Sequence, residues 1–183
     1  HSQALNSTAP MKMEVDARVM GEGQLNAAFQ FATDTTDMDF SVRGTLGPMQ
    51  LSHFNKILEP AAYVHIKEGK NQNMQFSFSG NQHKATGTME FRYDDLSVLM
   101  IDKEKGQAGF DEKLGSFIAN AFVLKASNPK SVFLRIGNIE CERDPSRAMV
   151  NYWWKSILSG VKSSIGLDKN TEKTKDFVRK DGS

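Results

Sequence analysis

Apolar residues recur at every second position in successive segments of this chain, and this alternation constrains the fold more than any other feature. In residues 11–19, apolar residues alternate with charged ones: Met11, Met13, Val15, Ala17 and Val19 with Lys12, Glu14, Asp16 and Arg18. A β-strand points successive side chains to opposite faces, so such a strand has one apolar and one charged face. The pattern returns in Leu25–Phe31, Met38–Val42, Met74–Phe78 and Met89–Tyr93. We therefore expect a large antiparallel sheet with one face in water and one face covered.

Turn-forming residues separate the predicted strands. Glycine, asparagine and aspartate favour turns, and they predict turns at Gly21–Gly23, Asp34–Asp37, Gly69–Asn73, Gly80–His83 and Asp94–Asp95. Residues 113–125 fit both a helix and a strand, and we expect a helix that passes into a strand. Strand alternation returns at Val132–Ile136.

Two segments have helical spacing of their apolar residues. The first is Leu51–Glu59, and Pro60 is expected to end it. The second is Pro145–Gly166, an amphipathic helix with Asp144 as its predicted cap and with Gly160 in close packing against a neighbour.

These elements predict a mainly β fold of the α+β type. We expect a curved antiparallel sheet or β-groove with one short helix and one long C-terminal amphipathic helix. The 183 residues are enough to bury a core within one domain. The expected organisation is a flexible lead-in at 1–10, a single β-rich domain at 11–167 and a polar tail at 168–183.

Composition excludes several classes of function. With 23 basic and 22 acidic residues, the chain has no overall field that would attract nucleic acid. Its single cysteine forbids an internal disulfide. No apolar stretch approaches the roughly 20 residues that a transmembrane helix needs, so we expect none in this chain. The chain begins with His1 and without a leader, which is typical of an excised segment or a processed product.

The sequence offers no motif for catalysis, a metal or a cofactor. The four histidines lack the spacing that would place two ligands on one element. Cys141 has no neighbouring histidine that could activate it. The acidic residues at 34–39 lack the glycine and the later glutamate of a calcium loop, and Gly21–Gly23 lacks the third glycine of a dinucleotide-binding turn. We therefore expect a protein that is not an enzyme.

The apolar side of the predicted sheet is rich in phenylalanine and methionine. Twelve Phe and nine Met residues stand against three Tyr and two Trp. Such side chains suit an acyl chain, because they provide bulk and adaptability without polar groups. The alternative interpretation is that they form an ordinary hydrophobic core.

The order of segments resembles the C-terminal region of AsmA-like envelope proteins, in the Bacteroidetes branch of the AsmA and TamB superfamily. The resemblance spans residues 11–167 and is carried by Leu51–Glu104, Ala119–Pro129 and Arg135–Leu167, the last including the motif YWWK. It implies a β-groove with an apolar interior, in a periplasmic protein attached to the inner membrane through a segment absent from this chain. It also implies a role in phospholipid transport between membranes or in outer-membrane assembly.

The leading hypothesis is therefore a non-enzymatic module that shields an acyl chain of a phospholipid. The residues expected to line the groove are Phe29, Phe31, Phe40, Phe76, Phe78 and Phe91, and a helix with Trp153, Trp154 and Ile157 is expected to cap it. The alternative is a structural or docking domain with a filled core, which binds the rest of its own polypeptide or an envelope protein. A hydrolase is a third class, for which no residues converge.

Overall fold

The computed structural model describes residues 9–33, 37–62, 64–100, 123–130 and 132–167. Within them the chain is mainly β, with an open antiparallel sheet of eight strands and two α-helices. The strands are β1 Met11–Val19, β2 Gly23–Phe31, β3 Phe40–Leu46, β4 Met49–Gln50, β5 Val64–Gly80, β6 Lys84–Met100, β7 Val123–Asn128 and β8 Ile136–Glu142. The helical segments are the 3-10 turn η1 Leu51–Phe54, α1 Asn55–Ala62 and α4 Met149–Ser164. The main strand order is β1-β2-β3-β5-β6-β7, while β4 pairs with β5 and β8 pairs with β6.

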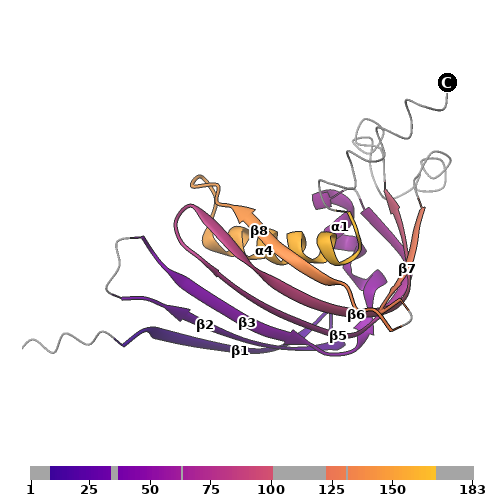
Figure 1. The fold of residues 1–183 in the computed structure, drawn as a ribbon, viewed down its shortest axis with the longest axis horizontal. Helices are drawn as coiled ribbons and strands as arrows, with labels where there is room; N and C mark the ends of the chain where they lie inside the picture. The colour runs from indigo at the N-terminus through magenta and orange to yellow at the C-terminus, as the bar shows by residue number, and fades with distance from the viewer. Residues whose placement is uncertain (1–8, 34–36, 63, 101–122, 131, 168–183) are drawn as a thin grey trace, which may run out of the picture.

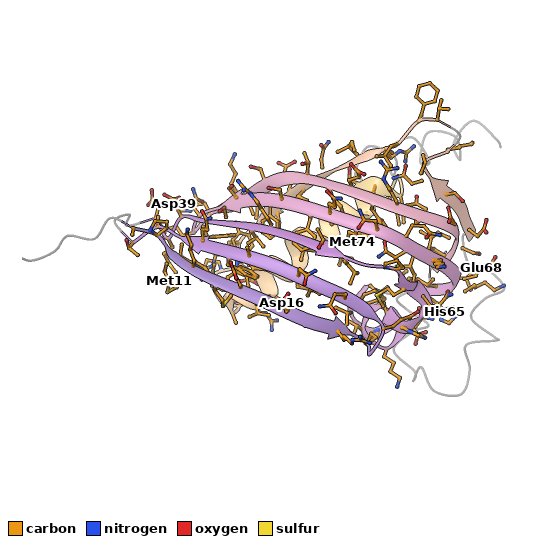
Figure 2. The ribbon with its side chains drawn as sticks, turned by 90° about the horizontal axis from the view of Figure 1, so that it is seen from below. Met11, Asp16, Asp39, His65, Glu68 and Met74 are labelled. Atoms are coloured by element: carbon orange, nitrogen blue, oxygen red, sulfur yellow. The ribbon has the colours of Figure 1, made fainter. Side chains whose placement is uncertain are left out.

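The sheet curves around α4, which lies along its inner face (Figure 1). The outer face carries polar side chains toward solvent (Figure 2). The predicted alternation is confirmed in β5, where Phe76 and Phe78 are buried while Gln75 and Ser77 are exposed. The prediction of a mainly β, antiparallel fold is therefore confirmed.

The predicted turn at Gly69–Asn73 is wrong, because β5 runs through it as one strand of 17 residues. Its pairing with β6 shifts register between Ile66 and Glu68, between Glu68 and Lys70 and between Asn71 and Asn73. Such shifts are β-bulges, which bend a strand without ending it. Gly69 lies among them with φ of 142°, a conformation that glycine accepts readily.

The predicted turn at Asp94–Asp95 is wrong for the same reason. Both residues lie inside the 17-residue strand β6, where the pairing with β7 shifts between Tyr93 and Leu96. Asp95 has φ of 49°, and its N–H donates to Ser127 Oγ at 3.0 Å. In contrast, the turns predicted at Gly21–Gly23 and Gly80–His83 are confirmed as the connections from β1 to β2 and from β5 to β6.

The ends of the helices differ from the sequence prediction. Helix α1 continues to Ala62 with Pro60 inside it, which is tolerable because the proline removes a hydrogen bond only from the last turn. Helix α4 begins at Met149 and not at Pro145, and its N-terminus has no side-chain cap. Asp144 instead accepts hydrogen bonds from Ser146 N at 3.0 Å and Ser146 Oγ at 2.6 Å.

Strand β8 also starts later than predicted, since alternation at Val132–Ile136 is followed by a strand at Ile136–Glu142. Of the segment 113–125, only the end that enters β7 is described. The remainder, the turn residues 34–36, most of the lead-in and the tail at 168–183 lie outside the described residues.

Candidate functional site

The inner face of the sheet is an aromatic cluster that forms the core. Phe40, Phe76, Phe78 and Phe91 are between 2% and 6% exposed. Phe40 and Phe78 meet edge to face, with ring centroids 6.2 Å apart. The Phe76 ring also fills the space beside Gly44, where an added Cβ would lie 2.3 Å from Phe76 Cζ. These rings are therefore buried and in contact with one another and with the backbone of the sheet.

Helix α4 covers this cluster with its own aromatic side chains. The Trp153 ring lies 4.8 Å from the Phe29 ring and 6.0 Å from the Phe31 ring, measured between centroids. The Tyr152 ring lies 5.8 Å from the Phe40 ring. Four of the predicted groove residues, Phe40, Phe76, Phe78 and Phe91, are therefore buried beneath the protein's own atoms, whereas Phe29 and Phe31 remain partly exposed.

The three residues predicted to cap the groove differ in whether they contact the core. Trp153 and Ile157 are partly buried and pack against the core cluster. Trp154 is also partly buried, but it is not among the residues that pack against that cluster. Trp153 is thus the residue of the three that reaches the β2 side of the sheet.

The covering by α4 ends before β1. Met11 is 58% exposed and Met13 is 39% exposed, although both lie on the face that is buried elsewhere. The register pairs Met11 with Phe31, Met13 with Phe29 and Val15 with Ala27. Directly paired residues share a face, so these side chains form one continuous surface. We call Met11, Met13, Val15, Phe29 and Phe31 the open strip.

The opposite border of the sheet consists of β7 and β8, and serines of α4 cover β8. Ser163 Oγ accepts a hydrogen bond from Asn138 N at 3.0 Å, and Ser159 Oγ accepts one from Glu140 N at 3.1 Å. An added Cβ at Gly137 would lie 2.4 Å from Gly160 O, so the helix rests directly on the strand. Covering a border strand in this way removes its free N–H groups from other partners.

This serine face was missed by sequence reasoning, which assigned only Gly160 to close packing. A signal existed, since small residues recur three or four positions apart at Ser156, Ser159, Gly160, Ser163 and Ser164. Residues at that spacing share one side of a helix. The prediction was based on the apolar stripe of α4, which does not include these serines.

Strand β1 forms an edge with unsatisfied charge. Among the described strands it pairs only with β2, and its outward residues are Lys12, Glu14, Asp16 and Arg18. Their partners on β2 carry no charge, namely Gln30, Ala28, Asn26 and Gln24. Within the described residues, none of the four forms an ion pair. Their charges are therefore available to a neighbour on the free side of β1.

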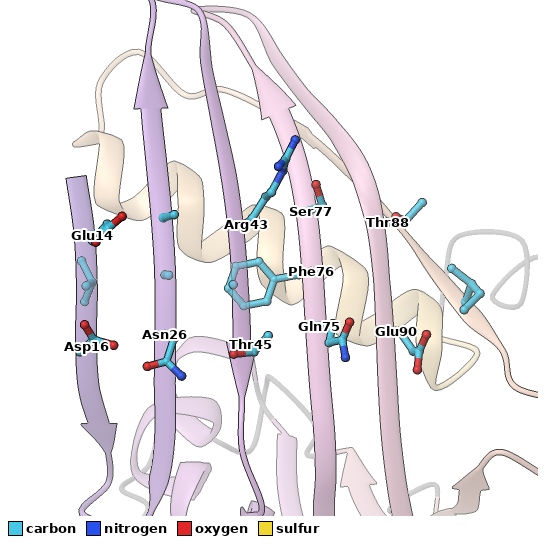
Figure 3. A pocket seen from close by; sticks show the side chains of 15 residues that line it. Glu14, Asp16, Asn26, Arg43, Thr45, Gln75, Phe76, Ser77, Thr88 and Glu90 are labelled. Carbon is cyan, nitrogen blue, oxygen red and sulfur yellow. The ribbon is translucent and has the colours of Figure 1, made fainter. Parts of the chain in front are cut away.

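A hollow of about 630 Å³ lies on the outer face of the sheet, across β1, β2, β3, β5 and β6 (Figure 3). Its labelled lining is mostly polar and includes Glu14, Asp16, Asn26, Arg43, Thr45 and Gln75. Helix α4 lies behind the sheet in this view. The hollow is thus on the opposite face from the aromatic cluster, and both polar and apolar residues line it.

Two histidine–carboxylate contacts are found among the described titratable side chains. His65 Nδ1 lies 2.5 Å from Glu59 Oε1, and His53 Nδ1 lies 3.0 Å from Glu22 Oε2. Burial raises the pKa of the Cys141 thiol, which disfavours the nucleophilic thiolate. The described part of the chain holds no group of His, Cys, Asp and Glu residues that could bind a metal.

Two further pKa shifts have structural causes. Burial raises the pKa of Tyr152 to about 12, and the Tyr152 hydroxyl has no hydrogen-bond partner. Hydrogen bonds from Ser146 lower the pKa of Asp144. Both shifts follow from burial or local turn geometry and need no ligand.

Comparison with protein-family models, with curated proteins and with solved structures finds no significant match to the chain. A search of the described residues also finds no helix that is long and apolar enough to cross a membrane.

Proposed function

We propose that this chain is a non-enzymatic module of the bacterial envelope that forms the closed end of an apolar β-groove. In this proposal the groove shields acyl chains of phospholipids during transport between membranes or outer-membrane assembly. The module works in the periplasm, in a protein attached to the inner membrane through a segment absent from this chain. Helix α4 fills the end of the groove, and the open strip is where an acyl chain meets the module.

The observation that carries this proposal is the change in exposure across the inner face. Met89 is 0% exposed and Phe78 is 2% exposed beneath α4, whereas Met11 is 58% exposed at the β1 border. If the apolar face served only as the core of this sheet, we would expect its last strand to be covered as well. Each apolar side chain left exposed loses roughly 1.5–3 kcal/mol of stabilisation from burial. The uncovered border therefore supports continuation of the apolar face beyond β1.

The proposal assigns a narrower set of lipid-contacting residues than the sequence did. An acyl chain would contact Met11, Met13, Val15, Phe29 and Phe31, which form the open strip. Phe40, Phe76, Phe78 and Phe91 would hold α4 in place. Trp153 would be the last side chain of the protein that a lipid tail meets, because its ring lies over Phe29 and Phe31.

A fluorescent acyl probe and a pair of adjacent substitutions test the proposal. Met13→Asp places a charge in the open strip, while Lys12→Asp changes the neighbouring residue on the outer face and is the matched control. We expect Met13→Asp to weaken probe binding by about tenfold or more, and Lys12→Asp to leave it unchanged. Absence of probe binding by the unaltered protein, with no lipid in its organic extract, would reject the proposal.

The charges along β1 favour a second candidate, a docking domain that adds a partner strand to its edge. In the antiparallel self-pairing with full overlap, Lys12 would face Arg18 and Glu14 would face Asp16. Like charges directly opposite each other are destabilising, so a second copy is a poor partner. A better partner is a strand that carries acidic, basic, basic and acidic residues, in that order, at alternate positions, with apolar residues between them.

This candidate is tested by joining such a strand to the protein. Residues 1–10 are replaced by a designed strand followed by Asn-Gly, a sequence that forms two-residue hairpins. The strand with matched charges should slow hydrogen exchange of the β1 amides and raise the melting temperature. A strand with every charge inverted is the control, and equal effects of the two strands would exclude recognition by charge.

A further inference from the structure

The connection between β7 and β8 displays two apolar side chains at its tip. Phe133 is 80% exposed and Val132 is 83% exposed. They are adjacent in the sequence, and both side chains are open to solvent. The connection lies at the border of the sheet remote from β1, with β2, β3, β5 and β6 between them (Figure 2). We call Val132 and Phe133 the apolar tip.

The base of the apolar tip is held by buried hydrogen bonds. Asn128 is 3% exposed. Its Nδ2 donates to Phe91 O at 2.7 Å and to Arg135 O at 2.9 Å, and its Oδ1 accepts from Arg135 N at 2.8 Å. Lys130 and Phe133 also exchange backbone hydrogen bonds of 3.2 Å and 3.3 Å across the turn. The exposed side chains are therefore presented by a fixed base, which lowers the ordering cost of binding.

The size of the apolar tip argues for a lipid surface and against a protein pocket. Two side chains of this kind expose on the order of 300 Å² together. A stable protein interface needs about 800 Å² on each side, with complementary shape. A membrane interface accepts a small projecting apolar group without such complementarity, because lipids rearrange around it. A small projecting group is what the apolar tip offers.

The charges beside the tip fit the surface of an anionic bilayer. Lys130 lies beside the tip and is exposed, whereas the Arg135 guanidinium lies against Gly166 at the end of α4. Two acidic residues lie near the base of the connection: Glu90 is paired with Ile136, and Asp95 N bonds to Ser127 Oγ below the turn. A basic residue at the tip and acidic residues at its base would orient the tip toward anionic headgroups.

We propose that Val132 and Phe133 insert into the interface of a phospholipid bilayer, with Lys130 at the level of the headgroups. The module then contacts a membrane at one border of its sheet and leaves β1 at the other border free. This contact is independent of the open strip, because it uses different residues and a different partner surface.

Co-sedimentation with vesicles tests the membrane contact. The vesicles consist of phosphatidylethanolamine and phosphatidylglycerol, with phosphatidylcholine vesicles as the uncharged comparison. Loss of two inserted apolar side chains in Val132→Ser/Phe133→Ser should reduce partitioning into the anionic vesicles by roughly tenfold or more. The matched control is Val150→Ser, which alters an apolar residue of α4 that is 68% exposed, and it should bind like the unaltered protein.

Two additional measurements separate insertion from other causes. Lys130→Glu should weaken binding to the anionic vesicles by roughly fivefold and leave phosphatidylcholine binding unchanged. A dye that responds to polarity, attached through Phe133→Cys in a Cys141→Ser background, should shift to the blue on adding vesicles. Unchanged circular dichroism shows that a variant is folded. The proposal is overturned if the unaltered protein does not sediment with either vesicle, if Val132→Ser/Phe133→Ser binds normally, or if Val150→Ser loses binding equally.

Discussion

A methyl group added at Gly137 provides a direct test of how α4 rests on β8. The Cβ of Gly137→Ala would lie 2.2 Å from Ser164 Oγ and 2.4 Å from Gly160 O. The serine hydroxyl could rotate away, although it would lose its 2.8 Å hydrogen bond to Gly160 O. The carbonyl belongs to the helix backbone and has no such freedom. The helix must therefore retreat by about 1 Å to reach ordinary contact distance.

The cost of this retreat follows from the contacts that it breaks. The hydrogen bonds from Asn138 N and Glu140 N to serines of α4 measure 3.0 Å and 3.1 Å, and each would open beyond bonding distance. Each contributes about 0.5–1.5 kcal/mol, and poorer helix packing adds about 1–3 kcal/mol. Replacing glycine within a strand returns about 0.5–1 kcal/mol. We expect a net loss of about 1–5 kcal/mol in the free energy of unfolding.

Equilibrium unfolding in guanidinium chloride measures this loss through tryptophan fluorescence. The two tryptophans of the chain, Trp153 and Trp154, both lie on α4, so the signal reports the element that moves. The control is Gly47→Ala, whose Cβ would meet Gln24 O at 3.6 Å, an ordinary contact. A loss below about 0.5 kcal/mol for Gly137→Ala, which is the range of a neutral substitution, would refute the tight seating of α4.

Three more substitutions probe the core, the base of the apolar tip and the sealed border. Burial raises the pKa of Tyr152 from 10.0 to about 12 in the folded protein, so the tyrosine of the unfolded chain ionises at lower pH. The free energy of unfolding should therefore fall by up to roughly 2–3 kcal/mol as the pH rises from 10 to 12. Tyr152→Phe should reduce that fall in urea titrations and cost less than about 1 kcal/mol at neutral pH, because the hydroxyl has no partner. Asn128→Ala should cost about 2–4 kcal/mol through the loss of buried hydrogen bonds, and a melting temperature within a degree of the unaltered protein would contradict this. Ser163→Ala should cost about 1 kcal/mol and speed hydrogen exchange at Asn138 N, while unchanged exchange there would show that the serine does not protect β8.

The sequence predicted the sheet well because alternation of apolar and polar residues reports directly on a strand with one buried face. Phe76 and Phe78 of β5 are buried as their spacing requires. The continuity of β5 and β6 was not predictable from local residues. Gly69 and Asp95 adopt positive φ in bulges, and the same residue types favour turns.

The candidate site was only partly predictable, because periodicity identifies an apolar face without saying what covers it. Phe29, Phe31, Phe40 and Phe78 share the same sequence pattern, yet the first two are partly exposed and the last two are buried. The difference arises from where α4 lies, which depends on contacts between residues far apart in the chain. The serine contacts of β8 depend on the same long-range placement.

The difference between the two borders of the sheet limits how copies of this protein can associate. In a fibre that grows by pairing between sheet edges, every molecule needs two free borders, because each copy pairs with one neighbour at each border. Here the N–H groups of Asn138 and Glu140 are occupied by serine hydroxyls, so β8 cannot receive the β1 of another copy. Head-to-tail pairing of β1 with β8, which could repeat without limit, is therefore blocked.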